Sequence, residues 1–201
     1  MKKVFLDCGT NLCQGLNQIS NENKIDENWI VYSFDANPDV FNYIDRNKHS
    51  NVNFINEAVW IESCERFLNQ EILDVVTKEH IESLNGDKFL DAKVGGSTNI
   101  MGDDYNWGSW IDNDKKLINS LKVKCFDFSS FIRDNFSKED YIVVKLDIEG
   151  AEYEVMDKLI SDGTIDYIDS IYVEWHTIKG KNKFYYINLI NSKKIKYTEW
   201  Y

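Results

Sequence analysis

The sequence predicts an α/β protein in which a mostly parallel sheet carries helices on both faces. Apolar residues run without alternation through 142–144 and again through most of 169–173, a pattern typical of parallel strands that are buried on both sides. Between the predicted strands lie segments with apolar residues at helical spacing, which indicates repeated strand–helix units. Ligands of such sheets bind where the carboxyl ends of the strands meet the amino ends of the helices.

Length and composition predict one domain, residues 1–201, with an insert at about 60–121. A chain of 201 residues with 43% hydrophobic content can bury one sizeable core. Its net charge of −11 argues against nucleic acid or a membrane as a partner, since both require clustered Lys and Arg. The cysteines lack metal-ligand spacing, and neither a signal segment nor an 18-residue apolar run occurs. We therefore expect a soluble, cytoplasmic protein, whose oligomeric state the sequence leaves open.

The first predicted strand, residues 4–7, ends in Asp7 and leads through a glycine turn into a helix. Gly9 would let the backbone approach a ligand closely, and Asp7 would meet the charged or hydroxyl groups of that ligand. Cys13 stands where a pyrophosphate-binding turn would carry another glycine, so a ligand without phosphates is favoured.

The second predicted strand, residues 29–34, ends in Asp35. A strand–helix–strand unit places at this position the acid that binds ribose hydroxyls, which makes Asp35 the predicted ribose ligand. The alternative is that Asp35 only caps the helix that Asn37 and Pro38 are predicted to begin. A third strand, 53–55, ends at the same height, where a bound adenine would lie.

The insert has no clear strand–helix period. It is expected to hold a hairpin within 64–76 and a glycine-rich loop at 95–99, where Ser97 could offer a hydroxyl to a bound cofactor. Further along, Tyr105, Trp107 and Trp110 lie among small polar residues, a combination that suits stacking on a sugar or a flat organic acceptor. The alternative is that these aromatic side chains form the core of the insert.

Two neighbouring strands of the C-terminal half are predicted to deliver ionisable side chains to one edge of the sheet. The strand 141–147 ends in Asp147 with Glu149 just beyond it, and the strand 169–173 is followed by Glu174 and His176. The remaining predicted elements are a strand at 122–126, a helix capped by Asp127, a helix after Gly150 closed by Asp162 and Gly163, a helix at 181–191 and a strand at 194–200.

The segments VFLDCGTN, SFDANP, NEAV and VVKLDIEGAE, in this order and followed by VEWH, resemble the FkbM family of S-adenosylmethionine-dependent methyltransferases. The resemblance implies the class I methyltransferase fold, which is Rossmann-like, and O-methylation of a sugar, glycan or small natural product, with S-adenosylhomocysteine as the other product. The predicted cofactor-binding residues are Asp7, Gly9, Thr10, Asn11, Asp35, Ala36, Glu57, Ala58, Ser97 and Asp147. Only one strand is predicted after residue 194, so the seventh, antiparallel strand of this class is missing or comes from the insert.

A methyltransferase acting on a hydroxyl must also remove its proton. A neutral histidine with a pKa of about 6.5 suits that task, so His176 is the predicted general base, with Asp147 or Glu174 orienting it and Glu149 facing the acceptor. The alternative for His176 is a structural hydrogen bond to a neighbouring loop.

Three further readings stay open. The carboxylates at this edge and His176 could instead bind Mg²⁺ or Mn²⁺, but the metal-free route is favoured because carboxylates at strand ends also serve the cofactor. A catalytically silent cofactor-binding module is the alternative from another functional class. Ribose O-methylation of nucleic acid is opposed by the negative net charge.

Overall fold

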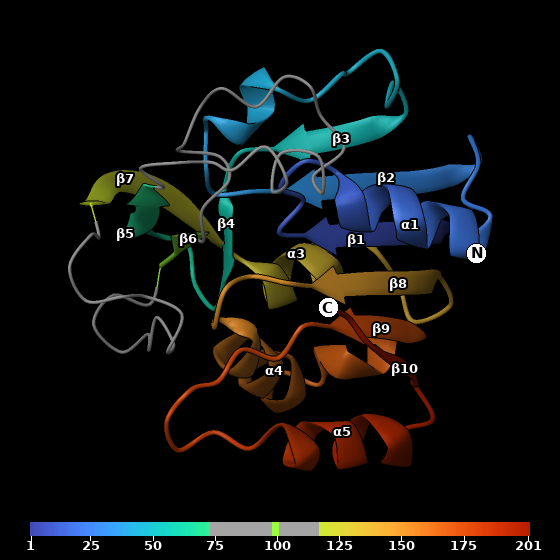
Figure 1. Ribbon diagram of the computed structural model, residues 1–201. Coiled ribbons are helices and arrows are strands. Elements are labelled where there is room, and N and C mark those ends of the chain that lie inside the picture. Colours follow the sequence, from blue (N-terminus) through green and yellow to red (C-terminus); the bar gives the residue numbers. More distant parts are fainter. Residues whose placement is uncertain (73–97, 101–116) are drawn as a thin grey trace.

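The computed structural model describes residues 1–72, 98–100 and 117–201 (Figure 1). Its central sheet has six strands in the order β10-β9-β8-β1-β2-β3, and every neighbouring pair in it is parallel. The strands are β1 (Lys3–Cys8), β2 (Trp29–Phe34), β3 (Val52–Ile55), β8 (Tyr141–Leu146), β9 (Ser170–Val173) and β10 (Lys196–Glu199). The predicted α/β class is confirmed, and each of these strands overlaps its predicted range.

Helices cover both faces of this sheet. Helix α1 (Gln14–Asn23) packs its buried Leu16 and Ile19 against Phe5 and Val143 on one face. On the opposite face, α3 (Phe128–Asn135), α4 (Glu152–Ser161) and α5 (Lys183–Ser192) cover the alternate strand residues, which include Val4, Leu6, Ile142 and Val144. Two apolar layers therefore hold the strands from both sides, which explains why these segments show no alternation.

Turn and cap residues set two helix ends as the sequence indicated. The side chain of Asp127 accepts a hydrogen bond from Ser130 N at the start of α3. Helix α4 ends at Ser161, and Gly163 follows in the left-handed region with φ 71° before the short 3₁₀ helix η3 (Thr164–Tyr167).

The prediction of a helix that begins at Asn37 and Pro38 is wrong. The segment forms only a short 3₁₀ turn, η1 (Val40–Asn42). Asn37 Oδ1 accepts from Asp39 N at 3.0 Å, and Asp45 Oδ1 accepts from Asn47 N at 3.0 Å. These side chains satisfy local backbone donors in turns, which competes with continuing a helix.

A second, smaller sheet has the strand order β4-β7-β5-β6. Its strands are β4 (Ala58–Trp60), β5 (Cys64–Ile72), β6 (Thr98–Asn99) and β7 (Leu117–Asp127). The hairpin predicted within 64–76 does not form in the described part of that range, because β5 pairs antiparallel with the distant β7. Strand β4 was not predicted at all. In Figure 1 this sheet lies beyond the arrowheads of the central strands, so it stands over the edge where ligands of such folds bind.

The sequence left open whether a seventh, antiparallel strand joins the central sheet. In the part of the chain that the structure describes, the central sheet contains no antiparallel strand, and the strands of the insert belong to the small sheet. None of the helices that the structure describes is long and apolar enough to span a membrane.

Candidate functional site

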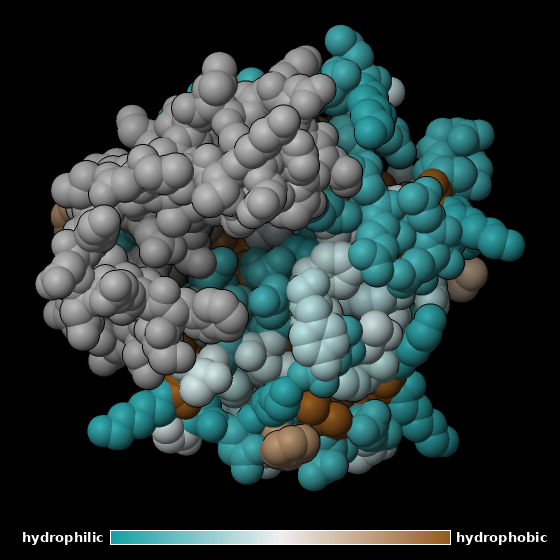
Figure 2. Space-filling view, in the orientation of Figure 1, coloured by the Kyte–Doolittle hydropathy of each residue, from teal (hydrophilic) through white to brown (hydrophobic). Residues whose placement is uncertain are grey.

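A cavity of about 340 Å³ opens at the carboxyl edge of the central sheet. It is lined by residues that follow β1, β2, β3 and β8, together with residues of the small sheet and the C-terminal end of the chain. Figure 2 shows a hydrophilic hollow on the face that Figure 1 presents. Most of the predicted cofactor residues meet here: Gly9, Thr10, Asn11, Asp35, Ala36, Glu57, Ala58 and Asp147 all line the cavity.

The turn after β1 lines the cavity and lies against the residue that follows β8. The N–H groups of Gly9 and Thr10 donate to the carbonyl oxygen of Phe34 at 2.9 and 3.0 Å. Gly9 has φ 79°, and a Cβ atom there would lie 1.7 Å from the carbonyl oxygen of Asp147. Only glycine fits this position, because both the backbone conformation and the available space exclude a side chain.

Asp35 follows β2, lines the cavity and binds the backbone of two turns. Its Oδ2 accepts from Asn11 N and its Oδ1 from Asn37 N, each at 2.8 Å. Burial raises the pKa of Asp35 to about 6, although these two N–H groups act to lower it. Asp35 therefore binds the backbone of two turns, although it caps no helix, because the helix predicted after it does not form. Ribose binding stays a prediction, since each carboxylate oxygen can accept a second hydrogen bond.

A row of polar side chains crosses the centre of the sheet just below the cavity. Asp7 pairs in register with Ser33 of β2 and with Lys145 of β8. Ser33 Oγ donates to Asp7 Oδ2 at 2.8 Å, and Lys145 Nζ lies 3.7 Å from Asp7 Oδ1. The carboxylate of Asp7 is fully buried and is absent from the cavity lining, which corrects the expectation that it meets the cofactor directly. Its contacts instead hold Lys145.

Lys145 was missed by the sequence reasoning, although a lysine within a buried apolar strand is a signal in itself. Its Nζ donates to Gly9 O at 2.7 Å and lies 3.0 Å from Asp147 Oδ2. Burial opposes the charge of Lys145, but Asp147 and Asp7 outweigh it and raise the pKa of Lys145 above its usual value. Helix α1 makes room for the side chain at Gly15, where a Cβ atom would lie 2.4 Å from Lys145 Cε.

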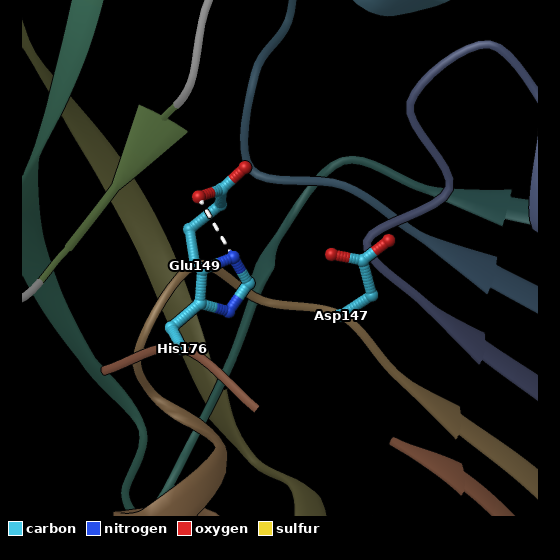
Figure 3. A group of neighbouring side chains, drawn as sticks. All are labelled: Asp147, Glu149 and His176. Atoms are coloured by element: carbon cyan, nitrogen blue, oxygen red, sulfur yellow. Dashed lines mark ion pairs between the residues drawn. The ribbon is translucent and has the colours of Figure 1, made fainter. Parts of the chain in front are cut away.

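His176 lies between carboxylates that come from two strand ends. Its Nε2 is 3.2 Å from Glu149 Oε2 (Figure 3). The same nitrogen is 3.9 Å from Glu174 Oε1, and Nδ1 is 3.1 Å from Glu152 Oε1. The nearest orienting groups are thus Glu149 and Glu152, and not Asp147 or Glu174 as predicted. Burial acts to lower the pKa of His176, but the hydrogen bonds and charges of Glu149 and Glu152 raise it to about 11. The role of general base stays a prediction that this charged form does not favour.

Glu174 and Asp147 form a second pair in the cavity wall. Burial and the charge of Asp147 raise the pKa of Glu174 to about 7. Burial also acts to raise the pKa of Asp147, but Lys145 outweighs it and holds that pKa below the usual value. Asp147 is consequently the first of this pair to ionise, and Glu174 changes between its acid and carboxylate forms near neutral pH.

The remaining predicted site residues either lie outside the described part of the chain or line the cavity, and some lining residues were not predicted. Ser97, Tyr105, Trp107 and Trp110 lie outside the described residues. The predicted acceptor residue Glu149 lines the cavity, as do Gly15, Lys145 and Trp200, which were not predicted. Trp200 follows β10, and its ring lies 5.7 Å from Lys145 Nζ. A tryptophan so far along the chain carries no local signal of this role, because only the parallel pairing of β9 and β10 brings it to the cavity edge.

The parallel sheet, the glycine turn after its first strand and the polar cavity over its carboxyl edge define a Rossmann-like α/β protein with a candidate cofactor site. The family model described as Methyltransferase FkbM domain matches residues 7–192. The chain belongs to this family and is thus a methyltransferase, as the resemblance of its motifs implied. Searches of curated proteins and of solved structures gave no significant match.

Proposed function

We propose that this methyltransferase moves a methyl group from S-adenosylmethionine to a hydroxyl of a sugar, glycan or small natural product. One observation carries the proposal: a single cavity joins the Gly9 turn and Asp35 on one side to Asp147, Glu149 and Glu174 on the other. The first group has the chemistry of a nucleoside cofactor site, and the second has carboxyl groups able to orient a hydroxyl and accept its proton.

The residues of the first group fit S-adenosylmethionine. The cavity of about 340 Å³ is within the size range of cofactor sites. Asp35 would accept hydrogen bonds from the ribose hydroxyls, and Ala58 with the neighbouring Ile100 offers an apolar wall for adenine. The Gly9 turn would hold the methionine part, where a side chain is sterically excluded. When bound, this cofactor supplies an electrophilic methyl group on a sulfonium sulfur.

On the acceptor side, the protein must orient a hydroxyl and take up its proton as the new oxygen–carbon bond forms. We assign the proton to Glu174, because its side chain lines the cavity and is 35% exposed. His176, by contrast, has carboxylate oxygens within 3.2 Å of both ring nitrogens. Such a ring donates at both positions and must lose a proton before it can act as a base. Most of the rate would come from holding the hydroxyl in line with the methyl group.

The test combines calorimetry with S-adenosylhomocysteine and a labelled-methyl transfer assay over a panel of hydroxylated sugars and natural products. Glu174→Gln should lower kcat while S-adenosylhomocysteine binds as in the wild type. Asp35→Asn should weaken S-adenosylhomocysteine binding, whereas Asp26→Asn, an exposed aspartate that makes a similar turn hydrogen bond to Asn28 N, should not. Full turnover in Glu174→Gln would return the base to His176.

The same assays address the silent cofactor-binding module. That reading was motivated by Cys13 in the glycine turn, but Cys13 adopts φ 66° and so takes the left-handed conformation that a glycine would. Binding of S-adenosylhomocysteine without transfer to any acceptor would favour the silent module. Absence of binding would refute both readings.

A further inference from the structure

We infer that Asp147, Glu149 and His176 form a binding site for one divalent cation of the Mg²⁺ or Mn²⁺ type at the acceptor side of the cavity. One ligand atom from each residue lies within 4.8 Å of the other two. Asp147 and Glu149 follow β8, and His176 follows the adjacent strand β9, so the parallel pairing of these strands converges the three side chains (Figure 3). The cation binding rests on these residues, while its part in methyl transfer rests on the proposed function.

The histidine is oriented for a ligand by a residue outside the trio. Glu152 Oε1 lies 3.1 Å from His176 Nδ1, and the side chain of Glu152 is fully buried. Glu152 is fixed in turn by the backbone, because it accepts from Ile148 N at 2.9 Å and from Gly150 N at 3.0 Å. A buried carboxylate on one ring nitrogen is the usual support of a metal-binding histidine. The cation would take the place of the proton through which Nε2 contacts Glu149, because histidine binds metals in its neutral form.

The two carboxylates of the trio are held in place as well. Lys145 Nζ lies 3.0 Å from Asp147 Oδ2 and connects this residue to the row of polar side chains beneath the cavity. Glu149 has φ 54°, and its Oε2 already lies 3.2 Å from His176 Nε2. With side chains 23%, 27% and 17% exposed, Asp147, Glu149 and His176 are reachable from the cavity without being free to rotate into solvent.

The ligand set selects the class of cation. Two carboxylate oxygens with a single imidazole and no thiolate favour a hard cation that keeps further positions for water or substrate oxygens. Glu174 Oε1 lies 3.9 Å from His176 Nε2 and places a further carboxyl oxygen beside the trio. Since Asp147, Glu149 and Glu174 line the same cavity as Gly9 and Asp35, a cation here would meet the acceptor hydroxyl and favour its deprotonated form.

The experiment measures Mn²⁺ binding by electron paramagnetic resonance on the full chain after EDTA treatment and dialysis. The wild type should bind one equivalent of Mn²⁺. Glu149→Gln and His176→Gln should each weaken binding by about tenfold or more, and Glu152→Gln, which only supports His176, by about 10–100-fold. Glu139→Gln serves as the matched control, because Glu139 is exposed and lies outside the cavity.

Calorimetry with S-adenosylhomocysteine and circular dichroism on the same samples separate the possible failures. The cation site is overturned if Mn²⁺ does not bind stoichiometrically, or if both Glu149→Gln and His176→Gln bind it as the wild type does. In either case, a normal affinity for S-adenosylhomocysteine would leave the proposed function standing. Stoichiometric Mn²⁺ binding that the two substitutions weaken supports the site even if S-adenosylhomocysteine does not bind. Because Glu149 is partly exposed, Glu149→Gln keeps the test decisive if the histidine variant fails to fold.

Discussion

Lys145→Met removes the buried cation that the centre of the sheet is built around, and we expect it to cost about 3–5 kcal/mol of unfolding free energy. Lys145 Nζ contacts Gly9 O at 2.7 Å, Asp147 Oδ2 at 3.0 Å and Asp7 Oδ1 at 3.7 Å. Methionine is unbranched like lysine and replaces all but the terminal ammonium group, so the loss is mainly one of charge. Asp7 would remain fully buried with Ser33 as its hydrogen-bond donor, and none of the described residues donates a hydrogen bond to its Oδ1.

The second arm of this test removes the charge that Lys145→Met leaves unpaired. In the double variant Asp7→Asn/Lys145→Met, no buried carboxylate faces a missing cation at that position, so much of the lost stability should return. Urea unfolding followed by tryptophan fluorescence measures each variant, with an unchanged m-value as the condition for comparing midpoints.

A surface pair provides the control. Lys138 lies 3.9 Å from Asp166, and the two side chains are 55% and 43% exposed. Lys138→Met should change the unfolding free energy by at most about 1 kcal/mol, since exposed ion pairs contribute little. If Lys145→Met were as mild as Lys138→Met, or if Asp7→Asn failed to restore stability, the view of Lys145 as the buried partner of Asp7 would be refuted.

Three further substitutions probe the cavity. Gly9→Ala should abolish S-adenosylhomocysteine binding or folding because its Cβ would lie 1.7 Å from Asp147 O, whereas Gly180→Ala, with φ 82° and no atom within 4 Å, should cost only about 1–2 kcal/mol in urea unfolding. Gly15→Ala gains about 1 kcal/mol of helix propensity, but the new methyl group would crowd Lys145 at a cost of about 1–3 kcal/mol, so the variant should be less stable in urea unfolding. A more stable variant would contradict the close contact between Gly15 and Lys145. Asp35 has a pKa of about 6, and only its ionised carboxylate accepts hydrogen bonds from both ribose hydroxyls. The affinity for S-adenosylhomocysteine, measured by calorimetry, should therefore fall by up to about tenfold for each pH unit below 6. The same pH dependence in Asp35→Asn would exclude Asp35 as its cause.

The sequence predicted the central sheet well because its strands are buried on both sides and are bounded by turn residues. It predicted less where a local signal competed with tertiary structure. The residues after Pro38 have apolar spacing suited to a helix, yet the side chains of Asn37 and Asp45 bind backbone N–H groups in turns, and only a short 3₁₀ turn forms. The pairing of β5 with β7 joins segments separated by much of the insert, and no local pattern specifies such a partner.

The site was predictable to the extent that its residues follow strands. Gly9, Asp35, Asp147 and Glu174 all stand at strand ends, and all four line the cavity. What the sequence did not indicate is how the ionisable groups pair. His176 and Glu152 are far from adjacent in the chain, and their contact depends on how α4 begins beside the end of β9.

Asp147 contacts both the donor turn at Gly9, through Lys145, and the proposed cation site, so binding at one should affect binding at the other. On one side it is held by Lys145, which also binds the Gly9 carbonyl of the donor turn. On the other side it lies within 4.8 Å of the ligand atoms of Glu149 and His176.

A cation bound by the trio would compete with Lys145 for the negative charge of Asp147, so Lys145 would depend more on Asp7 and Gly9. Occupation of the cation site should therefore alter the affinity of the donor turn for S-adenosylhomocysteine, and by linkage the cofactor should change Mn²⁺ affinity by the same factor. Titrating Mn²⁺ with and without S-adenosylhomocysteine measures that factor, and a value of one would mean that Asp147 does not couple the two halves.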